Sequence, residues 1–529
     1  MLLLSLALVA GCAKRVTMVE QANRDQVLLL GNKDEPADLD PNVNEAISTT
    51  RILGALFEPL VRYSDDGQSV VPAVAASWEA SADGLTYSFH LRPDARWSNG
   101  RPVTAPDFRD SFLRVLDPKV SSVNASYAFA IVGAEDFLAG RLTDPRAVGI
   151  EAAGPYLLVL HLRFPAPYLL ETLTSDPFYP VFLADLDAHG GRRQRGGPWE
   201  RPGVLVSNGP FELAEWKANA FVRVTANPHY WDAAHVRVRE VRFFPTDDEN
   251  AEERSFRAGQ LHVTYRLPKT KVPAYASEHP EEFHIAQKLR VDFLTFNVIA
   301  GPFLDPRVRR AFSLAVDRDR LVKAALGRLA TPAATFVRPG TGGFQPTPRF
   351  HHDAAAARAE LAAAGFPGGK GFPSVELALN GTTGVTLAVA EVVQQMWRET
   401  LGVEVHLRPM EFKVYLAAAR DHAFQVLLEG FSPFPDPHDL LAFGVMGDPN
   451  NDAGAANPSY DAAFSAADRT VDLARRLVAF DAVEAINADQ VYYAPLYFEN
   501  QAVLVSPSVG GWRDHPMGDL NWHELFLKP

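Results

Sequence analysis

Histidines, an aspartate and glycine-rich loops are the parts of this sequence that could do chemistry. His351-His352-Asp353 has side chains that suit a metal ion, but adjacent side chains point in different directions in regular structure, and Asp353 is placed to cap an alanine-rich helix. Gly368-Gly369-Lys370-Gly371 lacks the spacing and the hydroxyl residue of a P-loop, and no strand-then-helix pattern surrounds the arginines of residues 190–197. Neither G-x-S-x-G nor H-E-x-x-H occurs. We therefore expect a protein that is not an enzyme and that holds no metal or cofactor.

The composition is typical of a large globular protein with an acidic surface. Hydrophobic residues make up 47% of the chain, enough to build cores, and 22% of the residues are charged. At 529 residues the chain exceeds what one core usually supports, so two or three lobes are expected. The net charge of −13 would be repelled by phosphates, which excludes nucleic acid and leaves small solutes as partners. A single cysteine rules out an intramolecular disulfide.

The elements that would position a binding site are clearest between residues 70 and 116. Asp83-Gly84 is a pair that closes hairpins. Residues 86–91 then alternate between apolar and polar, as a half-buried strand must. A second turn at Ser98-Asn99-Gly100 precedes a helix for which Thr104 is the expected N-cap, with Pro106 in the first turn. The stretch therefore predicts a β-hairpin followed by a helix.

This order resembles the signature of the bacterial extracellular solute-binding proteins of the peptide/nickel class, the family 5 or oligopeptide-binding-protein-like receptors of ABC importers. Their pattern W-x-x-S-x-D-G-x-x-Y-x-F-x-L-R, then W-x-(D/N)-G, is matched by Trp78, Ser81, Asp83, Gly84, Tyr87, Phe89, Leu91, Arg92, Trp97, Asn99 and Gly100. Further family blocks resemble residues 206–211, 227–232, 291–297 and 305–318. The resemblance covers the chain from about Val27 to its C-terminus.

The resemblance implies an α/β fold of the type II periplasmic-binding-protein-like kind, in which two lobes close on a ligand by a hinge and a smaller domain is inserted. It implies a monomeric receptor that captures a peptide or peptide-like solute in the interlobe cleft and delivers it to the membrane subunits of an ABC permease. Two alternatives stay open. One is a hydrolase-like enzyme on the same scaffold, which would need paired carboxylates facing one cleft, and the other is a structural lipoprotein.

The same resemblance divides the chain into parts. A discontinuous lobe I is expected to comprise residues 27–55, 202–287 and 497–529, with domain II at 56–201 and lobe III at 288–496. Within these parts, the apolar spacing of Leu53, Leu56, Phe57 and Leu60 predicts a helix over residues 52–61. Asp305 followed by Pro306 predicts the start of another helix.

The N-terminal residues predict export and lipid attachment. Residues 1–9 form an apolar run that is too short to span a bilayer, and Val9-Ala10-Gly11 leads directly to Cys12. This resembles the bacterial lipobox, in which the signal peptide, here 1–11, is removed and the Cys12 thiol takes a diacylglycerol. No lysine or arginine precedes the apolar run, which departs from that pattern. We expect residues 12–26 to form a tether and the protein to lie in the periplasm or cell envelope.

Candidate ligand-binding residues also come from the resemblance. Glu35 lies in a loop where relatives often place an acid at the mouth of the cleft, and a solvated loop carboxylate is the alternative. Tyr127 belongs to a segment from which an aromatic reaches the ligand in peptide binders, with core packing as the alternative. A third segment, G-W-x-A-D-Y-x-D-P in relatives, supplies Glu429, Phe431, Phe434 and Asp436.

That third segment contains the main departure from the family. Gapless counting from Asp436-Pro437 puts Pro433 where peptide binders keep the aspartate that holds the peptide's amino terminus. Similar counting puts Leu427 and Thr386 where relatives carry an arginine and a histidine. The residues expected to hold the ends of a peptide are therefore neutral here.

A buried amine without a partner would cost several kcal/mol. Two interpretations stay open. Either Glu35, Glu429 or Asp436 binds the amine, or the ligand is not a short peptide with free termini. A second departure, His262 in place of the family's acid at a strand entry, has no explanation at the level of sequence.

Overall fold

Lobe I is built on a mixed four-stranded sheet in the computed structural model, which describes residues 16–67, 69–381, 384–518 and 520–529. The strand order is β1-β10-β9-β8, with β1 parallel to β10 and the other pairs antiparallel. The strands are β1 (Val27–Gly31), β8 (Phe211–Lys217), β9 (Phe221–Ala226) and β10 (Glu240–Phe244). Its helices are α1 (Met18–Asp25), α2 (Ile47–Leu56), α7 (Glu249–Arg257) and α8 (Val272–Glu278).

Helix α2 corrects the helix expected at residues 52–61. It begins five residues earlier and ends at Leu56, with Phe57 already extended. Pro59 explains the end, because a proline disfavours the helical conformation in the residue before it. The expected apolar residues are all buried, but Phe57 and Leu60 lie in the segment that follows the helix rather than on the helix itself.

Domain II is an antiparallel sheet of order β4-β5-β7-β6 with a helix across one face. The predicted hairpin is confirmed, with Gly84 at φ +68° in the turn between β4 and β5. The predicted N-cap is also confirmed, since Thr104 and Asp107 form a capping box at α3. The elements are β2 (Val61–Tyr63), β3 (Val70–Pro72), β4 (Ala75–Ala80), β5 (Thr86–Leu91), β6 (Ile150–Gly154), β7 (Leu157–His161), α3 (Ala105–Val115), α4 (Ala134–Leu138), α5 (Leu169–Thr172) and α6 (Leu183–Ala188).

Lobe III surrounds a six-stranded sheet of order β12-β16-β11-β15-β13-β14. Its predicted caps are confirmed: Asp305 accepts from Arg307 N at 2.9 Å, and Asp353 caps α11. The strands are β11 (Phe283–Phe296), β12 (Ala330–Pro332), β13 (Val375–Asn380), β14 (Val405–Met410), β15 (Val426–Phe431) and β16 (Tyr493–Leu504). The helices are α9 (Pro306–Leu314), α10 (Arg318–Leu321), α11 (Ala354–Ala363), α12 (Val385–Leu401), α13 (Phe412–Arg420), α14 (Pro437–Leu441), α15 (Pro458–Asp468) and α16 (Leu473–Gln490).

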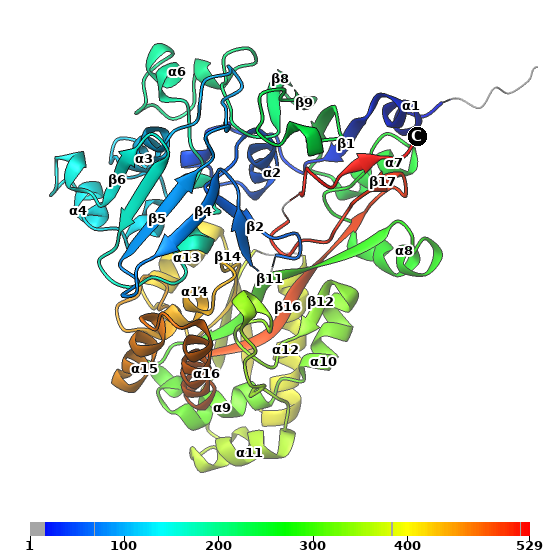
Figure 1. Cartoon of the computed structure of the whole chain (residues 1–529). Coiled ribbons are helices and arrows are strands. Elements are labelled where there is room, and N and C mark those ends of the chain that lie inside the picture. The colour runs from blue at the N-terminus through cyan, green and yellow to red at the C-terminus, as the bar shows by residue number, and fades with distance from the viewer. Residues whose placement is uncertain (1–15, 68, 382–383, 519) are drawn as a thin grey trace, which may run out of the picture.

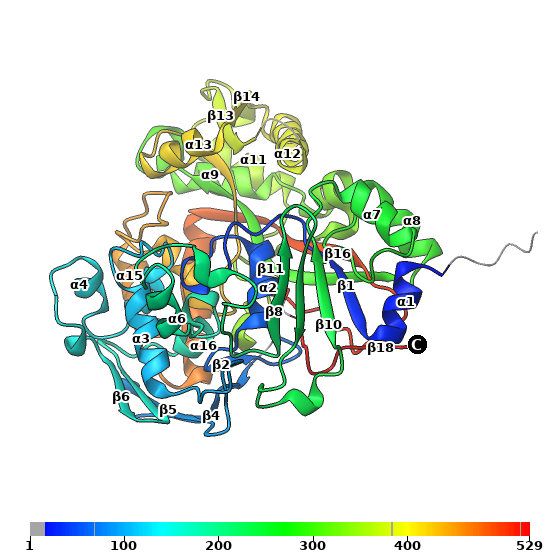
Figure 2. The same ribbon diagram turned by 90° about the horizontal axis from the view of Figure 1, so that it is seen from above.

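Two long antiparallel strands, β11 and β16, connect lobe III with lobe I (Figures 1 and 2). At the lobe I end, Leu504 N donates to Thr264 Oγ1 at 2.9 Å. The register between β11 and β16 shifts between Gln287 and Val291, so residues 288–290 bulge out of the ladder. After β16 the chain returns through lobe I in a short hairpin of β17 (Val509–Gly510) and β18 (Phe526–Leu527).

Each part has its own hydrophobic core. Lobe III has the largest cluster, domain II buries Phe89, Trp97 and Phe108, and lobe I buries Leu53, Phe211 and Trp522 among others. The end of domain II in the sequence does not coincide with the end of its core: Val181, Leu186 of α6 and Trp199 precede residue 202 and pack in the lobe I core. No described helix is both long enough and apolar enough to cross a membrane.

Part of the expected tether is folded. Thr17 and Glu20 form a capping box at the start of α1, and Ala22 is buried against lobe I. The structure also explains His262: Leu29 N donates to its Nδ1 at 3.0 Å, so Nε2 carries the proton and donates to Asn23 Oδ1 at 2.9 Å. Burial lowers the pKa of His262 to about 4, which keeps the ring neutral. A neutral histidine thus joins α1 to β1. Residues 1–15, including Cys12, lie outside the described part.

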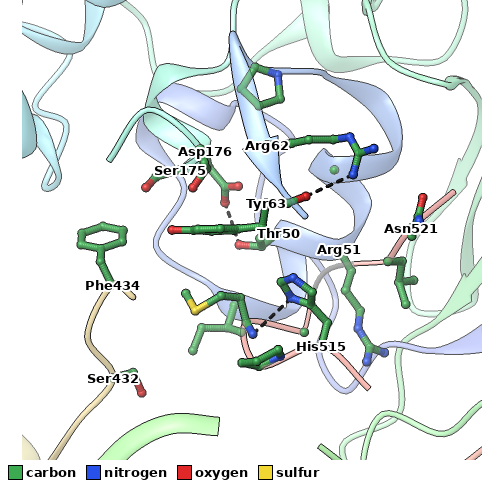
Figure 3. Close-up of a pocket in the computed structure, with 18 of the residues that line it drawn as sticks. Thr50, Arg51, Arg62, Tyr63, Ser175, Asp176, Ser432, Phe434, His515 and Asn521 are labelled. Carbon is green, nitrogen blue, oxygen red and sulfur yellow. Dashed lines mark hydrogen bonds between the residues drawn. The ribbon is translucent and has the colours of Figure 1, made fainter. Parts of the chain in front are cut away.

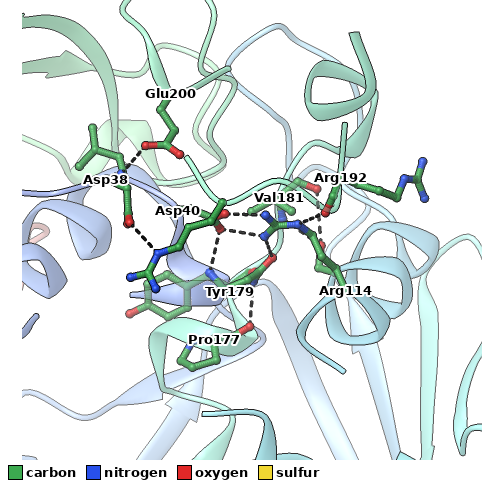
Figure 4. Close-up of polar contacts among 12 residues, drawn as sticks. Asp38, Asp40, Arg114, Pro177, Tyr179, Val181, Arg192 and Glu200 are labelled. Carbon is green, nitrogen blue, oxygen red and sulfur yellow. Dashed lines mark hydrogen bonds and ion pairs between the residues drawn. The ribbon is translucent and has the colours of Figure 1, made fainter. Parts of the chain in front are cut away.

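A buried ion pair fixes domain II to lobe I (Figure 4). The Arg114 guanidinium, on α3, donates to both carboxylate oxygens of Asp40 at 2.8 and 2.5 Å, and also to Asn42 Oδ1 at 2.8 Å. Its Nε donates to the carbonyl of Arg192, in the glycine- and arginine-rich loop. The other arginines of that loop, Arg193 and Arg195, pair with carboxylates, so the loop is held by protein acids rather than arranged around a phosphate.

Candidate functional site

A cavity of about 690 Å³ lies where the three parts meet (Figure 3). Its walls come from α2 and the loop before it, from domain II around Tyr127 and Asp176, from the β11 bulge, from the loop after β15, and from the chain between β17 and β18. Loops at the ends of parallel strands and between lobes are where ligands of α/β proteins bind. The cavity is therefore the candidate binding site.

Two of the six predicted residues, Tyr127 and Phe434, line this cavity. Their rings meet edge to face, with centroids 4.8 Å apart. Tyr127 lies in domain II, within the short 3-10 helix Ala125–Ala128, and Phe434 lies in lobe III, in the loop after β15. Tyr127 keeps 36% of its surface exposed. The pair forms an aromatic wall that spans two parts of the molecule.

Glu35 lies away from the cavity lining, inside lobe I. Trp216 Nε1 donates to its Oε1 at 2.7 Å, and Asn219 N donates to its Oε2 at 3.2 Å. Both carboxylate oxygens therefore hold the hairpin between β8 and β9. The structure gives Glu35 a local partner for each oxygen.

Glu429 and Phe431 lie in β15, behind the cavity. The Glu429 carboxyl accepts from the Thr295 hydroxyl. Burial and the nearby charge of Asp452 raise the pKa of Glu429 to about 8, so this carboxyl is mostly protonated at neutral pH. The Phe431 ring packs on Phe443, 4.9 Å between centroids, against the lobe III core. Neither side chain is among those that line the cavity.

Asp436 anchors the loop that carries Phe434. It caps α14 by accepting from His438 N at 2.8 Å, and it receives two hydrogen bonds from the Arg476 guanidinium, at 2.5 and 2.9 Å. Arg476 is itself fully buried, so this is an internal ion pair. Asp436 thus positions the loop of residues 432–435, and it does not face the cavity.

Of the three residues that depart from the family pattern, one lines the cavity and two lie elsewhere. Pro433 lines the cavity, where its ring offers neither charge nor a donor. Leu427 is fully buried in a small apolar cluster beside Tyr415, and Thr386 is half-buried at the start of α12. The three acids considered as replacement partners for an amine are all engaged within the fold.

The sequence did not point to the charged residues that do line the cavity. Asp176 accepts from Asn44 Nδ2 and from Thr50 Oγ1, both at 2.7 Å. Glu58 accepts from Tyr230 and Trp231, and burial raises the pKa of Glu58 to about 7. The run Lys288-Leu289-Arg290 continues the alternation of polar and apolar residues in β11, so it carries no sequence signal of its place at the cavity.

Arg290 is a cation of the cavity that two acids hold in place. Its guanidinium donates to Asp292 at 3.0 and 3.1 Å and lies 3.3 Å from Glu499. Burial opposes its charge, but the Asp292 carboxylate outweighs that and raises the pKa of Arg290 above its usual range. Gly430, in the neighbouring strand, leaves the necessary space: a Cβ there would lie 1.9 Å from Arg290 Nη2.

The histidine pair considered as a metal site lies elsewhere. His351 and His352 are exposed, each with its Nδ1 next to a backbone carbonyl, those of Arg349 and Leu314. No group of three or more metal-ligating side chains forms among the described residues.

Two long strands that connect lobe III with lobe I, and a cavity where the three parts meet, are the features of a lobed solute receptor. Residues 69–452 match the model of the bacterial extracellular solute-binding proteins, family 5. The chain is 31% identical over 497 residues to the periplasmic murein peptide-binding protein MppA of Escherichia coli K12, covering 92% of this chain and 90% of that protein. It is 31% identical over 513 residues to the probable deoxycholate-binding periplasmic protein YgiS of the same strain, covering 95% and 94%.

Solved structures give the same result. The unliganded open form of MppA superposes with a TM-score of 0.84 at 30% identity, covering 95% of this chain and 97% of that one. OppA of Haemophilus influenzae in complex with RPPGFSPFR gives a TM-score of 0.75 at 27% identity, covering 95% and 99%. The chain belongs to the family 5 bacterial extracellular solute-binding proteins, and its fold is that of the periplasmic peptide-binding proteins.

Proposed function

We propose that this protein is the receptor of an ABC importer that captures a peptide or peptide-like solute in the cavity between its lobes and delivers it to the permease. The observation that carries the proposal is the cavity itself, because its walls come from all three parts and β11 and β16 offer a hinge between them. Relatives named as murein peptide-binding and oligopeptide-binding proteins support the choice of solute.

In this proposal Tyr127 and Phe434 contact the ligand. Aromatic side chains offer large apolar surfaces at low entropy cost, and an edge-to-face pair at the rim can part to admit a solute between the rings. Glu429, Phe431 and Asp436 position the loop that carries Phe434, and Glu35 supports lobe I. A free amine on the ligand then has no partner among Glu35, Glu429 and Asp436.

The test is to identify what the protein binds. Native mass spectrometry of freshly purified protein should show a bound small molecule, and calorimetry with a library of peptides of three to five residues should show binding with one ligand per chain. The ligand should be recovered chemically unchanged, because a receptor contributes binding and closure only. Release of hydrolysed peptide by the purified protein would instead favour the hydrolase-like alternative.

We also propose that Cys12 carries a lipid that holds the protein at the membrane. The sequence Val9-Ala10-Gly11-Cys12 supports this. Cys12→Ala should move the protein from the membrane fraction to the soluble fraction in a cell fractionation, with ligand binding unchanged. A variant that stays in the membrane fraction would contradict the proposal.

A further inference from the structure

A cluster of ionisable groups lies at the junction between domain II and lobe III, apart from the residues that line the cavity. From domain II, Tyr168 at the start of α5 and Glu171 within it face lobe III. From lobe III come Asp436 and His438 at the start of α14, and Arg476 of α16. The Tyr168 ring stacks on the His438 imidazole with centroids 4.2 Å apart, so the two sides are in contact.

Two buried polar atoms of this cluster have no hydrogen-bond partner among the described residues: Oε2 of Glu171 and Nε of Arg476. The other guanidinium nitrogens of Arg476 are occupied by lobe III itself, since Asp436 accepts from both and Asp468 lies 3.8 Å from Nη2. Arg476 is therefore already compensated where Glu171 meets it. A buried carboxylate with no hydrogen bond and no cation of its own is costly. The contact thus favours the protonated form of Glu171.

Lobe III presents an excess of acids to this junction. Among the described residues, the ionisable groups that face Glu171 or His438 are, from domain II, Tyr63, Tyr87 and Tyr168, and, from lobe III, Asp436, Asp439, Asp448, Asp468 and Arg476. Phenols are uncharged below about pH 10, so four carboxyl groups stand against Arg476 and a protonated His438. Loss of a proton from Glu171 would add a negative charge on the domain II side, and loss of one from His438 would remove a positive charge on the lobe III side. Both changes make the two sides repel each other.

We propose that the cleft closes with the uptake of protons at this junction: domain II rests on lobe III while Glu171 and His438 are protonated, and the cleft opens when they lose their protons. This goes beyond the proposed function, because it concerns how the two parts come together and not which solute lies between them. A solute held between the closed lobes stabilises the same contact, so its binding and that of the protons strengthen each other.

The direction of the pH effect follows from the two environments of each group. In an open cleft both groups meet water and take their ordinary pKa values, 4.5 for Glu171 and 6.5 for His438. At the closed junction, burial and then the charge of Asp436 raise the pKa of Glu171 to about 8. Burial opposes a charge on His438, but the hydrogen bond to Asp468 and the surrounding acids raise its pKa overall. Closure is therefore favoured most below pH 4.5 and is lost as the pH rises toward 8.

The test measures opening directly, in protein without solute. Fluorophores are attached at Ala139→Cys, after α4, and at Ala462→Cys, on α15, two exposed positions in domain II and lobe III. Figures 1 and 2 show α4 and α15 on the same side of the molecule. The full chain also carries Cys12→Ala, so that the two new thiols are its only ones. Single-molecule energy transfer then counts open and closed molecules, and the ratio of open to closed should rise about tenfold or more from pH 5.5 to pH 9.

The variants assign this change to the junction. Glu171→Gln has nearly the shape of the protonated acid and should fold, which its melting temperature checks. Its ratio of open to closed molecules should change with pH about threefold less than that of the wild type. Adding His438→Gln should remove the pH dependence. Glu151→Gln, an exposed acid on β6 of the same domain, is the matched control and should open as the wild type does.

A ratio of open to closed molecules that is the same at the two pH values would overturn the inference. A ratio that changes in Glu171→Gln as much as in the wild type would also overturn it, because the protons would then bind elsewhere. Since no solute is present, either result leaves the proposed function standing. The proposed function fails separately, if the protein binds neither a co-purified molecule nor the peptide library, and opening that depends on Glu171 in such a protein would still support the inference.

Discussion

Domain II meets the rest of the molecule at two junctions, and they are built from different chemistry. At the junction with lobe I, Arg114 and Asp40 form a bidentate ion pair in which neither side chain is more than 1% exposed. At the junction with lobe III, rings meet: Tyr168 stacks on His438 with centroids 4.2 Å apart, and Tyr127 meets Phe434 edge to face. Separating the ion pair of the first junction costs much free energy. Separating the aromatic rings of the second junction costs little.

The difference indicates which parts move together. Separating a buried ion pair would leave two uncompensated charges, whereas two aromatic rings that part lose only about 0.5–1.5 kcal/mol beyond their buried area. Domain II should therefore stay with lobe I while the cleft opens and closes against lobe III. Because the aromatic wall of the cavity belongs to the second junction, ligand entry and this movement involve the same contacts.

The largest effect is expected at the first junction. Arg114→Gln leaves Asp40 buried without its partner, which should lower the free energy of unfolding by about 3–5 kcal/mol, measured by denaturant titration. Arg109→Gln, on the same helix but in a half-exposed pair with Asp110, should cost no more than about 1 kcal/mol. Equal losses in the two variants would mean that the first junction is no more firmly fixed than the surface.

The second junction should depend on pH through Glu171. Burial, and then the charge of Asp436, raises the pKa of Glu171 to about 8 from an ordinary 4.5. Native Glu171 therefore holds its proton where the unfolded chain has lost it. Its contribution is complete below pH 4.5 and is lost as the pH rises toward 8.

Glu171→Gln should remove that part of the pH dependence, so that the variant gains stability relative to the wild type between pH 5 and pH 8, on the order of 1–3 kcal/mol. Unfolding titrations at the two pH values measure it. Glu151 is an exposed acid on β6, and the stability of Glu151→Gln should change with pH as that of the wild type does. If the stability of Glu171→Gln changes with pH as that of the wild type does, Glu171 does not make this junction sensitive to pH.

His438 should act with the same sign as Glu171. Burial opposes a charge on its ring, but the hydrogen bond to Asp468 and the charges of Asp468, Asp436 and Asp439 raise its pKa overall. Protonated His438 stabilises the native state at low pH, and this contribution is lost as the pH rises through the raised pKa. Both groups therefore loosen the contact of domain II with lobe III in alkaline solution.

The smallest effect on stability, with a clear effect on binding, is expected at the aromatic wall. Tyr127→Ala removes a half-exposed ring and should weaken binding of the peptide library about tenfold, while the melting temperature changes little. Tyr127→Phe keeps the ring and should bind as the wild type does. If the alanine variant binds equally well, Tyr127 only packs against Phe434.

Local signals in the sequence predicted local structure well. Thr104, Asp305 and Asp353 cap helices where their positions indicated, because a cap depends on residues within one turn. The resemblance also led to the fold, and two of the six candidate site residues, Tyr127 and Phe434, line the cavity.

What the sequence could not give depends on contacts between distant segments. Asp40 and Arg114 are 74 residues apart, and nothing near either one indicates the other. Arg513 reaches the cavity only because the chain after β17 passes beneath α2, where Trp522 Nε1 donates to Gly54 O. The sequence suggested Asp436 and Glu429 as ligand contacts because it does not reveal their partners within the fold. Those partners, Arg476 and Asp452, come from later in the chain.

The way the end of the chain completes lobe I has a consequence for the order in which the protein is made. Gln26 Nε2 donates to the carbonyl of Leu527, across 501 residues, and Trp522 fills the lobe I core against Phe211. A chain that emerges from the N-terminus onward can fold domain II early, but lobe I and the floor of the cavity must wait for the last residues. An unfinished or C-terminally clipped chain would therefore expose the apolar surfaces that Trp522 covers, and a protease could distinguish it from the complete receptor.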